Sequence, residues 1–380
     1  MSSILVIDDD LMIRKLMEKI LVKENHHVYL ADTCKLGFEI INEKKPDLII
    51  LDLMLPDENG LDLLKTIKAI PEIKRIPVIV LTGSSQVDDK LLALRSGAVD
   101  YISKPFLSEE VKLRVQTQLK IHNLIESLRK ALLNIEDDLI AAEQIQRSLV
   151  PSTSPEKMNM YWLYKLSSKI GGDIFDVIHL GNDRYFMYLV DVSGHGVNAA
   201  MLSVMLNRFM SRHIQNLQSN YIDFNKLAYG LDKEFSFDKF ELFFTAIFCI
   251  IDYKSNEIVI SNAGHCYPIY LNENTCKIIE EPLEGIIGIS GYTGKTVKFQ
   301  IKKDSRLFFY TDGLIESFGT DKTPYGLDRL KEKIFGTKNM ILQDQMDYIY
   351  RDLIKFQDSD LFEDDMTFIG LNFSKEVNNV

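Results

Sequence analysis

The sequence lacks long apolar runs, a basic surplus and paired cysteines. No stretch of 18 apolar residues occurs, so no membrane span is expected. The formal net charge of −11, from 44 basic and 55 acidic residues, argues against a nucleic-acid-binding protein, which would need a basic face. The four cysteines show no zinc-site spacing and the N-terminus shows no signal-peptide pattern. Both features predict a cytoplasmic protein with reduced thiols.

Apolar blocks alternate with amphipathic segments over about the first 120 residues. This alternation predicts a parallel sheet with helices on both faces, and an active site outside the carboxyl ends of the strands. The blocks are Ile4–Ile7, Leu48–Leu51 and Val78–Leu81, and the amphipathic segments include Met12–Lys23, Gly60–Ile70 and Asp88–Arg95.

Carboxylates stand at the ends of two of these predicted strands. Asp8 and Asp9 end the first strand, and Asp52 ends the third. We expect the three side chains to hold one Mg²⁺, together with a backbone carbonyl near Met54. Asp52 is then placed to attack a phosphoryl donor while the metal neutralises charge.

Further polar residues complete a phosphate switch. Thr82 ends the fourth strand, and Lys104 follows the fifth, at Tyr101 and Ile102. Lys104 would pair with the new phosphate, and Thr82 would donate a hydrogen bond to it. In order and spacing these residues resemble the receiver domain of two-component response regulators. The resemblance implies that a sensor histidine kinase phosphorylates Asp52 and that Tyr101 is the switch aromatic.

A segment without glycine or proline runs from Glu109 to Leu149. Its apolar residues recur at spacings of three and four, which predicts a helix with a coiled-coil seam. Two interpretations stay open: a parallel coiled coil that makes a homodimer, with Gln146 fixing the register, or a lone helix packed on one of its own domains. The seam positions are Ile121, Ile125, Leu128, Leu132, Ile135, Leu139, Ala142, Gln146 and Leu149.

Four acidic motifs mark the second half of the chain. Aspartates so far apart act together only if the fold gathers them, and gathered carboxylates repel one another unless cations are present. Hard oxygen ligands favour Mg²⁺ or Mn²⁺. The motifs are Gly171–Asp176, Asp191–Gly196, Tyr310–Gly313 and Glu363–Thr367.

Each motif lies next to an apolar, strand-like run or a glycine turn. Because the end of one antiparallel strand lies beside the start of the next, the aspartates can share one sheet edge. Two divalent ions held there would lower the pKa of a bound water for in-line attack on a phosphoserine or phosphothreonine. The expected catalytic ligands are Asp173, Asp191, Asp312 and Asp364, supported by Asp176 and Asp365.

From about residue 160 to 373 the sequence resembles the bacterial stress-response and sporulation branch of the PP2C-type protein phosphatases. Besides the acidic motifs, the resemblance rests on Asn262–His265 with Pro268, on Tyr325-Gly326 before Arg329-Leu330, and on the entry Gln144–Pro151. It implies a sandwich of two antiparallel sheets flanked by helices, with two Mn²⁺ or Mg²⁺ ions at its edge. It also implies a phosphoserine or phosphothreonine protein as substrate, often an anti-sigma-factor antagonist.

Other interpretations fit the sequence less well. A cyclic-dinucleotide synthase would need an acidic residue at Ile174 and would leave the later motifs without a role. A non-catalytic, phosphorylation-controlled adaptor would have lost the aspartates, and solvated surface charge would not place every motif beside an apolar strand. His195 and His265 are candidate general acids, although histidines in glycine-rich turns are more often structural.

These patterns together predict a three-part chain. An α/β receiver with a doubly wound, five-stranded parallel sheet occupies residues 1–121, a helical linker residues 122–152, and an α+β, PP2C-like sandwich residues 153–376. The predicted function is a response regulator whose output is metal-dependent protein phosphatase activity. Phosphorylation of Asp52 would control it, in a direction that the sequence leaves open.

Overall fold

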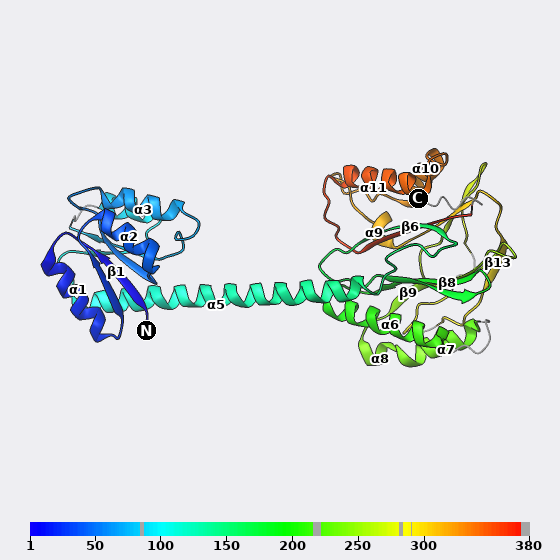
Figure 1. Ribbon diagram of the computed structural model, residues 1–380, viewed down its shortest axis with the longest axis horizontal. Coiled ribbons are helices and arrows are strands. Elements are labelled where there is room, and N and C mark those ends of the chain that lie inside the picture. The colour runs from blue at the N-terminus through cyan, green and yellow to red at the C-terminus, as the bar shows by residue number, and fades with distance from the viewer. Residues whose placement is uncertain (84–86, 216–221, 281–283, 290, 374–380) are drawn as a thin grey trace. The chain divides into compact units, whose positions relative to one another are not determined.

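The computed structural model describes residues 1–83, 87–215, 222–280, 284–289 and 291–373. It contains two compact units, Met1–Ile135 and Glu136–Val380, linked by helix α5 (Ser108–Arg147), as Figure 1 shows. Among the described residues, no helix combines the length and apolar character needed to cross a membrane. The domain limits at residues 121 and 152 stay predictions, and the limit at residue 376 lies outside the described residues.

The N-terminal unit is a doubly wound parallel sheet, as the sequence predicted. Its strand order is β2-β1-β3-β4-β5, and every neighbouring pair is parallel. The order reverses between β1 and β3, so the carboxyl ends of these strands form the switch point where such sheets bind ligands. The strands are β1 (Ser3–Ile7), β2 (His27–Ala31), β3 (Leu48–Asp52), β4 (Val78–Thr82) and β5 (Asp100–Ser103). The helices besides α5 are α1 (Leu11–Lys23), α2 (Cys34–Lys44), α3 (Gly60–Ala69) and α4 (Val87–Arg95).

Burial on both faces explains why these strands read as continuous apolar runs. Leu5 and Ile7 of β1 pack in a core with residues of α2 and α3. Ile4 and Val6 of the same strand pack in a second core with residues of α1 and α5. A strand covered on both sides has no polar face, so its polar residues are displaced to its ends.

The C-terminal unit is a sandwich of two five-stranded antiparallel sheets. Their orders are β13-β10-β9-β8-β7 and β12-β11-β14-β15-β6. The strands are β6 (Asn159–Lys165), β7 (Ile174–Gly181), β8 (Arg184–Val192), β9 (Phe244–Asp252), β10 (Glu257–Ala263), β11 (Ile269–Leu271), β12 (Cys276–Ile278), β13 (Val297–Gln300), β14 (Arg306–Tyr310) and β15 (Met366–Asn372). The helices are α6 (Val197–Gln215), α7 (Phe224–Glu234), α8 (Phe237–Phe240), α9 (Asp312–Ile315), α10 (Leu327–Gly336) and α11 (Leu342–Gln357).

Helices cover the outer face of each sheet in this unit. Helices α6 and α7 pack on the sheet that contains β8, and α10 and α11 pack on the sheet that contains β14 (Figure 1). A third core fills the space between the sheets. This layered arrangement is the predicted one, and it leaves the ends of β7, β8, β14 and β15 available to form a site.

Helix α5 carries the predicted seam, but its last polar position has a different role. Ile121, Leu128 and Ile135 are 45%, 63% and 56% exposed, so the first part of the seam is open. Gln146 is only 2% exposed, and its side-chain amide is hydrogen-bonded inside the C-terminal unit, to Gly171 and Ser203. The prediction that Gln146 fixes a coiled-coil register is therefore wrong, because its donors and acceptor are already used within one chain.

Candidate functional site

The first candidate site lies at the carboxyl ends of β1 and β3. Ligand atoms of Asp8, Asp9 and Asp52 all lie within 4.8 Å of one another. Asp8 is completely buried and Asp52 is 4% exposed, whereas Asp9 is exposed. Three carboxylates converging at a switch point match the oxygen ligands that Mg²⁺ prefers. The structure thus brings together the three residues predicted to bind a metal in the receiver.

Lys104 supplies the positive charge of this site. Its Nζ donates to Asp8 Oδ2 at 2.7 Å and to Asp52 Oδ2 at 2.6 Å. Although burial disfavours the charged form of Lys104, the hydrogen bonds to Asp52 and Asp8 outweigh it and raise the pKa of Lys104. Burial raises the pKa of Asp8 despite the opposing effect of Lys104. The ammonium therefore stays charged and stands where a phosphoryl group on Asp52 would need a counterion.

The two other predicted switch residues flank this centre. Thr82 is 3% exposed at the end of β4, and its backbone carbonyl accepts a hydrogen bond from the backbone N–H of Lys104 at 2.8 Å. Tyr101 lies half-buried on β5, with Lys90 Nζ 5.0 Å and the Arg114 guanidinium 5.6 Å from its ring centre. Both residues lie where the sequence placed them, and their roles in switching stay predictions.

In the second unit, strand alternation directs one residue of each acidic motif into the space between the sheets. For each of these residues, the strand residue two positions away packs in the core between the sheets. Because side chains alternate along a strand, the motif residue faces the same side. The pairs are Asp191 with Leu189, Asp173 with Phe175, Thr311 with Phe309, and Thr367 with Ile369. The four motifs therefore meet at one edge, where Thr367 touches Asp173 across 194 positions of sequence.

Asp173 lies deepest in this cluster. It is 1% exposed, and its Oδ2 accepts hydrogen bonds from Thr311 Oγ1 at 2.9 Å and Thr367 Oγ1 at 2.5 Å. Its buried Oδ1 has no hydrogen-bond partner within the described part of the chain. Burial, followed by the charges of Asp191 and Asp365, raises the pKa of Asp173 well above its ordinary value. A buried carboxyl oxygen without a donor is costly unless it serves a ligand.

Three more carboxyls share the electrostatic field around Asp173. Burial, then the charges of Asp312 and Asp364, raises the pKa of Asp191 well above its ordinary value. Asp191 and Asp312 lie close enough for each carboxyl to affect the pKa of the other. Burial, then Glu316, raises the pKa of Asp312, and burial also raises that of the more exposed Asp364. The four predicted catalytic aspartates thus form one interacting group.

Asp365 is held by hydrogen bonds that the sequence did not predict. Its Oδ1 accepts from the backbone N–H and hydroxyl of Ser167, at 2.8 and 3.0 Å. Its Oδ2 accepts from the backbone N–H of Gly172 at 2.6 Å and of Asp173 at 3.4 Å. A Cβ at Gly171 would lie 1.9 Å from this oxygen, so only glycine fits there. Both carboxyl oxygens of Asp365 already accept hydrogen bonds from the turns at Ser167 and at Gly172-Asp173. This arrangement favours a role in positioning the Asp173 turn over binding a metal.

Asp176 lies apart from the cluster. It is three residues beyond Asp173 on β7, and an odd separation places the two side chains on opposite faces of the strand. Asp176 shares its face with Ile174 and Ile178, which pack under α6. Burial, and then the charge of Asp176, raises the pKa of Tyr188 there. The predicted supporting role of Asp176 at the metal site finds no support in this placement.

The two histidines differ in environment. His265 is 4% exposed, with Nδ1 hydrogen-bonded to Thr245 Oγ1 at 2.8 Å, and burial lowers the pKa of His265 to about 3. The low pKa disfavours the imidazolium that would act as a general acid, and Asn262 bonds the His265 backbone N–H and carbonyl at 2.7 and 3.0 Å, which favours a structural role in the turn. His195 is exposed and lies close enough to Asp364 to offset part of the rise that burial causes in the pKa of Asp364.

Sequence reasoning missed several residues that hold the site together. Thr311 and Thr367 fix Asp173, Ser167 fixes Asp365, and Gln146 fixes Gly171. The two threonines lie within the acidic motifs, each two positions from an apolar residue, Phe309 or Ile369. This even spacing places each threonine on the same strand face as its apolar neighbour and could have identified both. Ser167 had no comparable signal, because its contact depends on how two distant turns meet.

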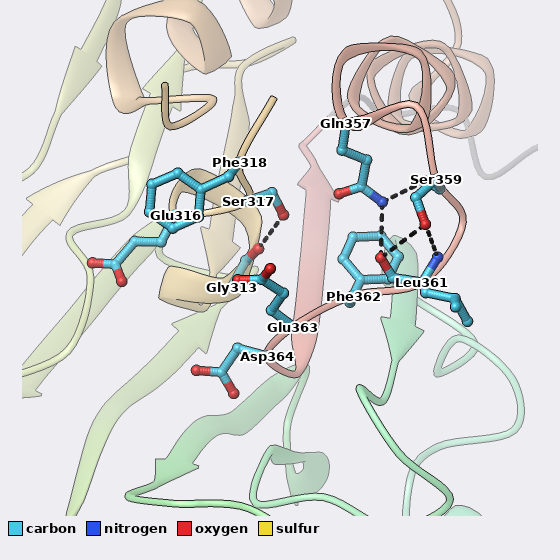
Figure 2. Close-up of a pocket in the computed structure, with 10 residues that line it drawn as sticks. All are labelled: Gly313, Glu316, Ser317, Phe318, Gln357, Ser359, Leu361, Phe362, Glu363 and Asp364. Carbon is cyan, nitrogen blue, oxygen red and sulfur yellow. Dashed lines mark hydrogen bonds between the residues drawn. The ribbon is translucent and has the colours of Figure 1, made fainter. Parts of the chain in front are cut away.

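A pocket of about 460 Å³ begins where the aspartate cluster ends. Its walls come from the segment at the end of α9, the end of α11 and the loop before β15 (Figure 2). Asp364 belongs both to the cluster and to the wall of this pocket. The pocket and the aspartate cluster therefore adjoin at Asp364.

Both sites fit divalent cations, though they differ in how tightly their carboxyls are drawn together. Among the described residues, Asp8, Asp9 and Asp52 are the one set of three candidate ligands whose ligand atoms all lie within 4.8 Å. The second site offers four interacting carboxyls and the orphaned Oδ1 of Asp173. Oxygen-only donors of this kind suit Mg²⁺ or Mn²⁺.

Comparison with known families matches both units. The family model described as Stage II sporulation protein E matches residues 181–374. The model described as response regulator receiver domain matches residues 4–116. The two matches fall on the sandwich and on the parallel sheet, respectively.

Individual proteins resemble parts of the chain. The KDP operon transcriptional regulatory protein KdpE of Escherichia coli (strain K12) is 37% identical over 123 residues, which is 32% of this chain and 53% of that protein. The chain therefore spans about half the length of this relative. The SiaA-PP2C domain of Pseudomonas aeruginosa superposes with a TM-score of 0.55 at 18% identity, covering 64% of this chain and 99% of that one. This second likeness shows a shared fold.

Proposed function

This chain belongs to the Stage II sporulation protein E family, and we propose that it is a response regulator whose output is metal-dependent dephosphorylation of a phosphoserine or phosphothreonine protein. The observation that carries the proposal is the convergence of Asp173, Asp191, Asp312 and Asp364 at one edge of the sandwich. A receiver domain preceding a phosphatase domain supports a two-component origin of the signal.

The four aspartates would hold two Mn²⁺ or Mg²⁺ ions, which when bound would activate a water and neutralise phosphoryl oxygens. The chain itself sets the geometry of these donors. Thr311 and Thr367 fix one oxygen of Asp173 and leave the other free to bind a cation. Asp365 holds the turn that precedes Asp173, so the deepest ligand is positioned before any substrate arrives.

We expect the purified chain to hydrolyse p-nitrophenyl phosphate and a phosphoserine protein when Mn²⁺ is supplied. EDTA should reduce the rate to background and excess Mn²⁺ should restore it. Without bound cations, the negative carboxylates would repel the phosphate dianion of the substrate. Release of p-nitrophenol and of inorganic phosphate measures both reactions. No turnover in saturating Mn²⁺, with a partner protein still bound, would show a non-catalytic adaptor instead.

We propose that α5 carries the control signal into the phosphatase. Gln146, near the end of α5, donates to the Gly171 carbonyl at 2.7 Å and accepts from the Gly171 N–H at 3.2 Å. The next residue, Gly172, is bound to Asp365, and Asp173 follows it. A rotation or shift at the end of α5 would therefore move the turn that positions the deepest aspartate.

The partners of the chain follow from the same proposal. A sensor histidine kinase would supply the phosphoryl group to Asp52, with one Mg²⁺ at Asp8, Asp9 and Asp52. The exposed seam from Ile121 to Ile135 would pair with a second copy in a parallel coiled coil. The substrate would be an anti-sigma-factor antagonist, as the resemblance of the sequence implies.

Replacing Asp52 by Asn should remove the response to phosphorylation and leave the unstimulated phosphatase rate within about twofold of the wild type. The reason is that Asp52 supplies the phosphoacceptor, whereas the hydrolytic aspartates belong to the other compact unit. The measurement is phosphatase activity with and without beryllofluoride. Asp62→Asn, at an exposed position on α3, is the matched control and should respond normally. A response that persists in Asp52→Asn would contradict the assignment, and loss of all activity would contradict separable units.

A further inference from the structure

The pocket beside the aspartate cluster has a distinct chemical character. Its ten lining residues include three carboxylates, those of Glu316, Glu363 and Asp364, and none of the ten is basic. Two apolar side chains also line it and are open to solvent: Phe318 is 49% exposed and Leu361 is 79% exposed. The volume of about 460 Å³ falls within the range of roughly 300–1,000 Å³ typical of ligand pockets.

Several polar groups of the pocket wall are fixed by internal hydrogen bonds, and three carboxylates also line it. Gln357 Nε2 donates to the Ser359 carbonyl at 2.6 Å, and the Leu361 N–H donates to Ser359 Oγ at 3.0 Å. Ser317 Oγ donates to the Gly313 carbonyl at 2.7 Å. Figure 2 shows these bonds and the side chains of Glu316, Glu363 and Asp364 beside them. The loop is thus held in place by contacts that leave the carboxylates and apolar surfaces for an occupant.

Continuity with the aspartate cluster identifies the occupant as part of the substrate. Asp364 lies in both, and Gly313 follows Asp312 directly. Extended residues advance by about 3.3–3.6 Å each, so residues within about three positions of a phosphorylated residue at the cluster would reach the pocket. Charge complementarity then decides which side chains fit, because an acidic flank would face three carboxylates and a basic flank would pair with them.

We propose that this pocket selects phosphoprotein segments in which a Lys or Arg and an apolar residue lie within about three positions of the phosphorylated Ser or Thr. This inference rests on the proposed phosphatase function and adds the specificity of its substrate. Glu316 and Glu363 receive the basic side chain, and Phe318 and Leu361 receive the apolar one. Asp364 remains with the metal-binding group.

The test compares two phosphoserine peptides that share flanking leucines and differ only in carrying Arg or Glu beside the phosphoserine. The full-length protein in Mn²⁺ should hydrolyse the Arg peptide with a kcat/KM about two- to fivefold above that of the Glu peptide, which is the range that one exposed charge pair contributes. The ratio should fall towards one in Glu363→Gln and reverse in Glu363→Lys. Glu332→Gln, an exposed position on α10 outside the pocket, is the matched control and should keep the wild-type ratio.

The outcomes separate this inference from the proposed function. Hydrolysis of p-nitrophenyl phosphate with equal kcat/KM for both peptides would overturn the pocket's role and leave the phosphatase standing. No hydrolysis of any substrate would count against the phosphatase itself. Fluorescence anisotropy of the unphosphorylated peptides needs no turnover, and equal binding of the Arg and Glu forms would overturn the pocket's role in that case as well.

Discussion

Asp191→Asn should abolish phosphatase activity and at the same time raise the thermal stability of the metal-free protein. The rate should fall by at least about 10³-fold, because a metal-binding carboxylate that helps to stabilise the transition state is lost. Stability should rise because burial, and then the charges of Asp312 and Asp364, raise the pKa of Asp191, so its carboxylate is repelled by its neighbours. Relief of about 1 kcal/mol of repulsion would raise the Tm by about 2–4 °C in a unit of this size.

The pH dependence of stability follows from the same shift. An acid whose folded pKa lies above its unfolded value binds more protons in the folded state between those two values. Stability therefore falls as pH rises from about 3.8, the unfolded value, through the raised pKa values of Asp173, Asp191 and Asp312. The metal-free protein carries the full penalty only at pH values above these raised pKa values. Asp191→Asn should flatten this decline.

Thermal unfolding in EDTA and in Mn²⁺, at pH 5 and pH 8, measures both effects. Mn²⁺ should stabilise the wild type more than Asp191→Asn, and the receiver contributes equally to both proteins. Asp328→Asn replaces a fully exposed carboxylate on α10 and should change neither activity nor stability. A lower Tm of Asp191→Asn in EDTA would show that Asp191 is held by favourable contacts, contrary to the repulsion inferred here.

The receiver site could be predicted residue by residue because of its topology. In a parallel sheet every strand ends at the same edge, so polar residues that directly follow apolar runs must meet. Asp8, Asp52 and Lys104 follow this rule, and the structure joins them by hydrogen bonds of 2.6–2.7 Å. In this fold, a residue's position directly after an apolar strand is therefore enough to place it at the site.

The phosphatase site was less predictable because antiparallel strands and turns add two further conditions. The face of each strand matters: Asp173 and Asp176 stand in one motif, yet their odd separation sends them to opposite faces. Contacts between turns matter too, and neither the Asp365–Ser167 bond nor the Gln146–Gly171 bond has a local sequence signal. The alternation of side chains along β7 could have corrected the assignment of Asp176 to the metal site. The contacts between turns could not be predicted in this way, because they depend on how the sheets pack.

Asp365→Ala should also abolish activity, but with the opposite effect on stability. Its carboxylate contributes repulsion to Asp173 and Asp191, and it also accepts four hydrogen bonds from Ser167, Gly172 and Asp173. Hydrogen bonds to a charged group contribute about 1.5–3 kcal/mol each, and buried donors left unpaired cost about 1–3 kcal/mol. The lost hydrogen bonds should outweigh the relieved repulsion and lower stability by about 3 kcal/mol, or about 6–12 °C in Tm.

The sign of the stability change therefore separates two neighbouring aspartates that activity alone cannot distinguish. Asp364 and Asp365 are adjacent in sequence, yet Asp364 is exposed at the pocket and Asp365 is 5% exposed between two turns. Thermal unfolding in EDTA should rank Asp365→Ala below the wild type and Asp191→Asn above it. Asp360→Ala, exposed in the same loop, is the control for loop truncation and should match the wild type. If Asp365→Ala melted above the wild type, its carboxylate would belong with the mutually repelling ligands and not with the contacts that position Asp173.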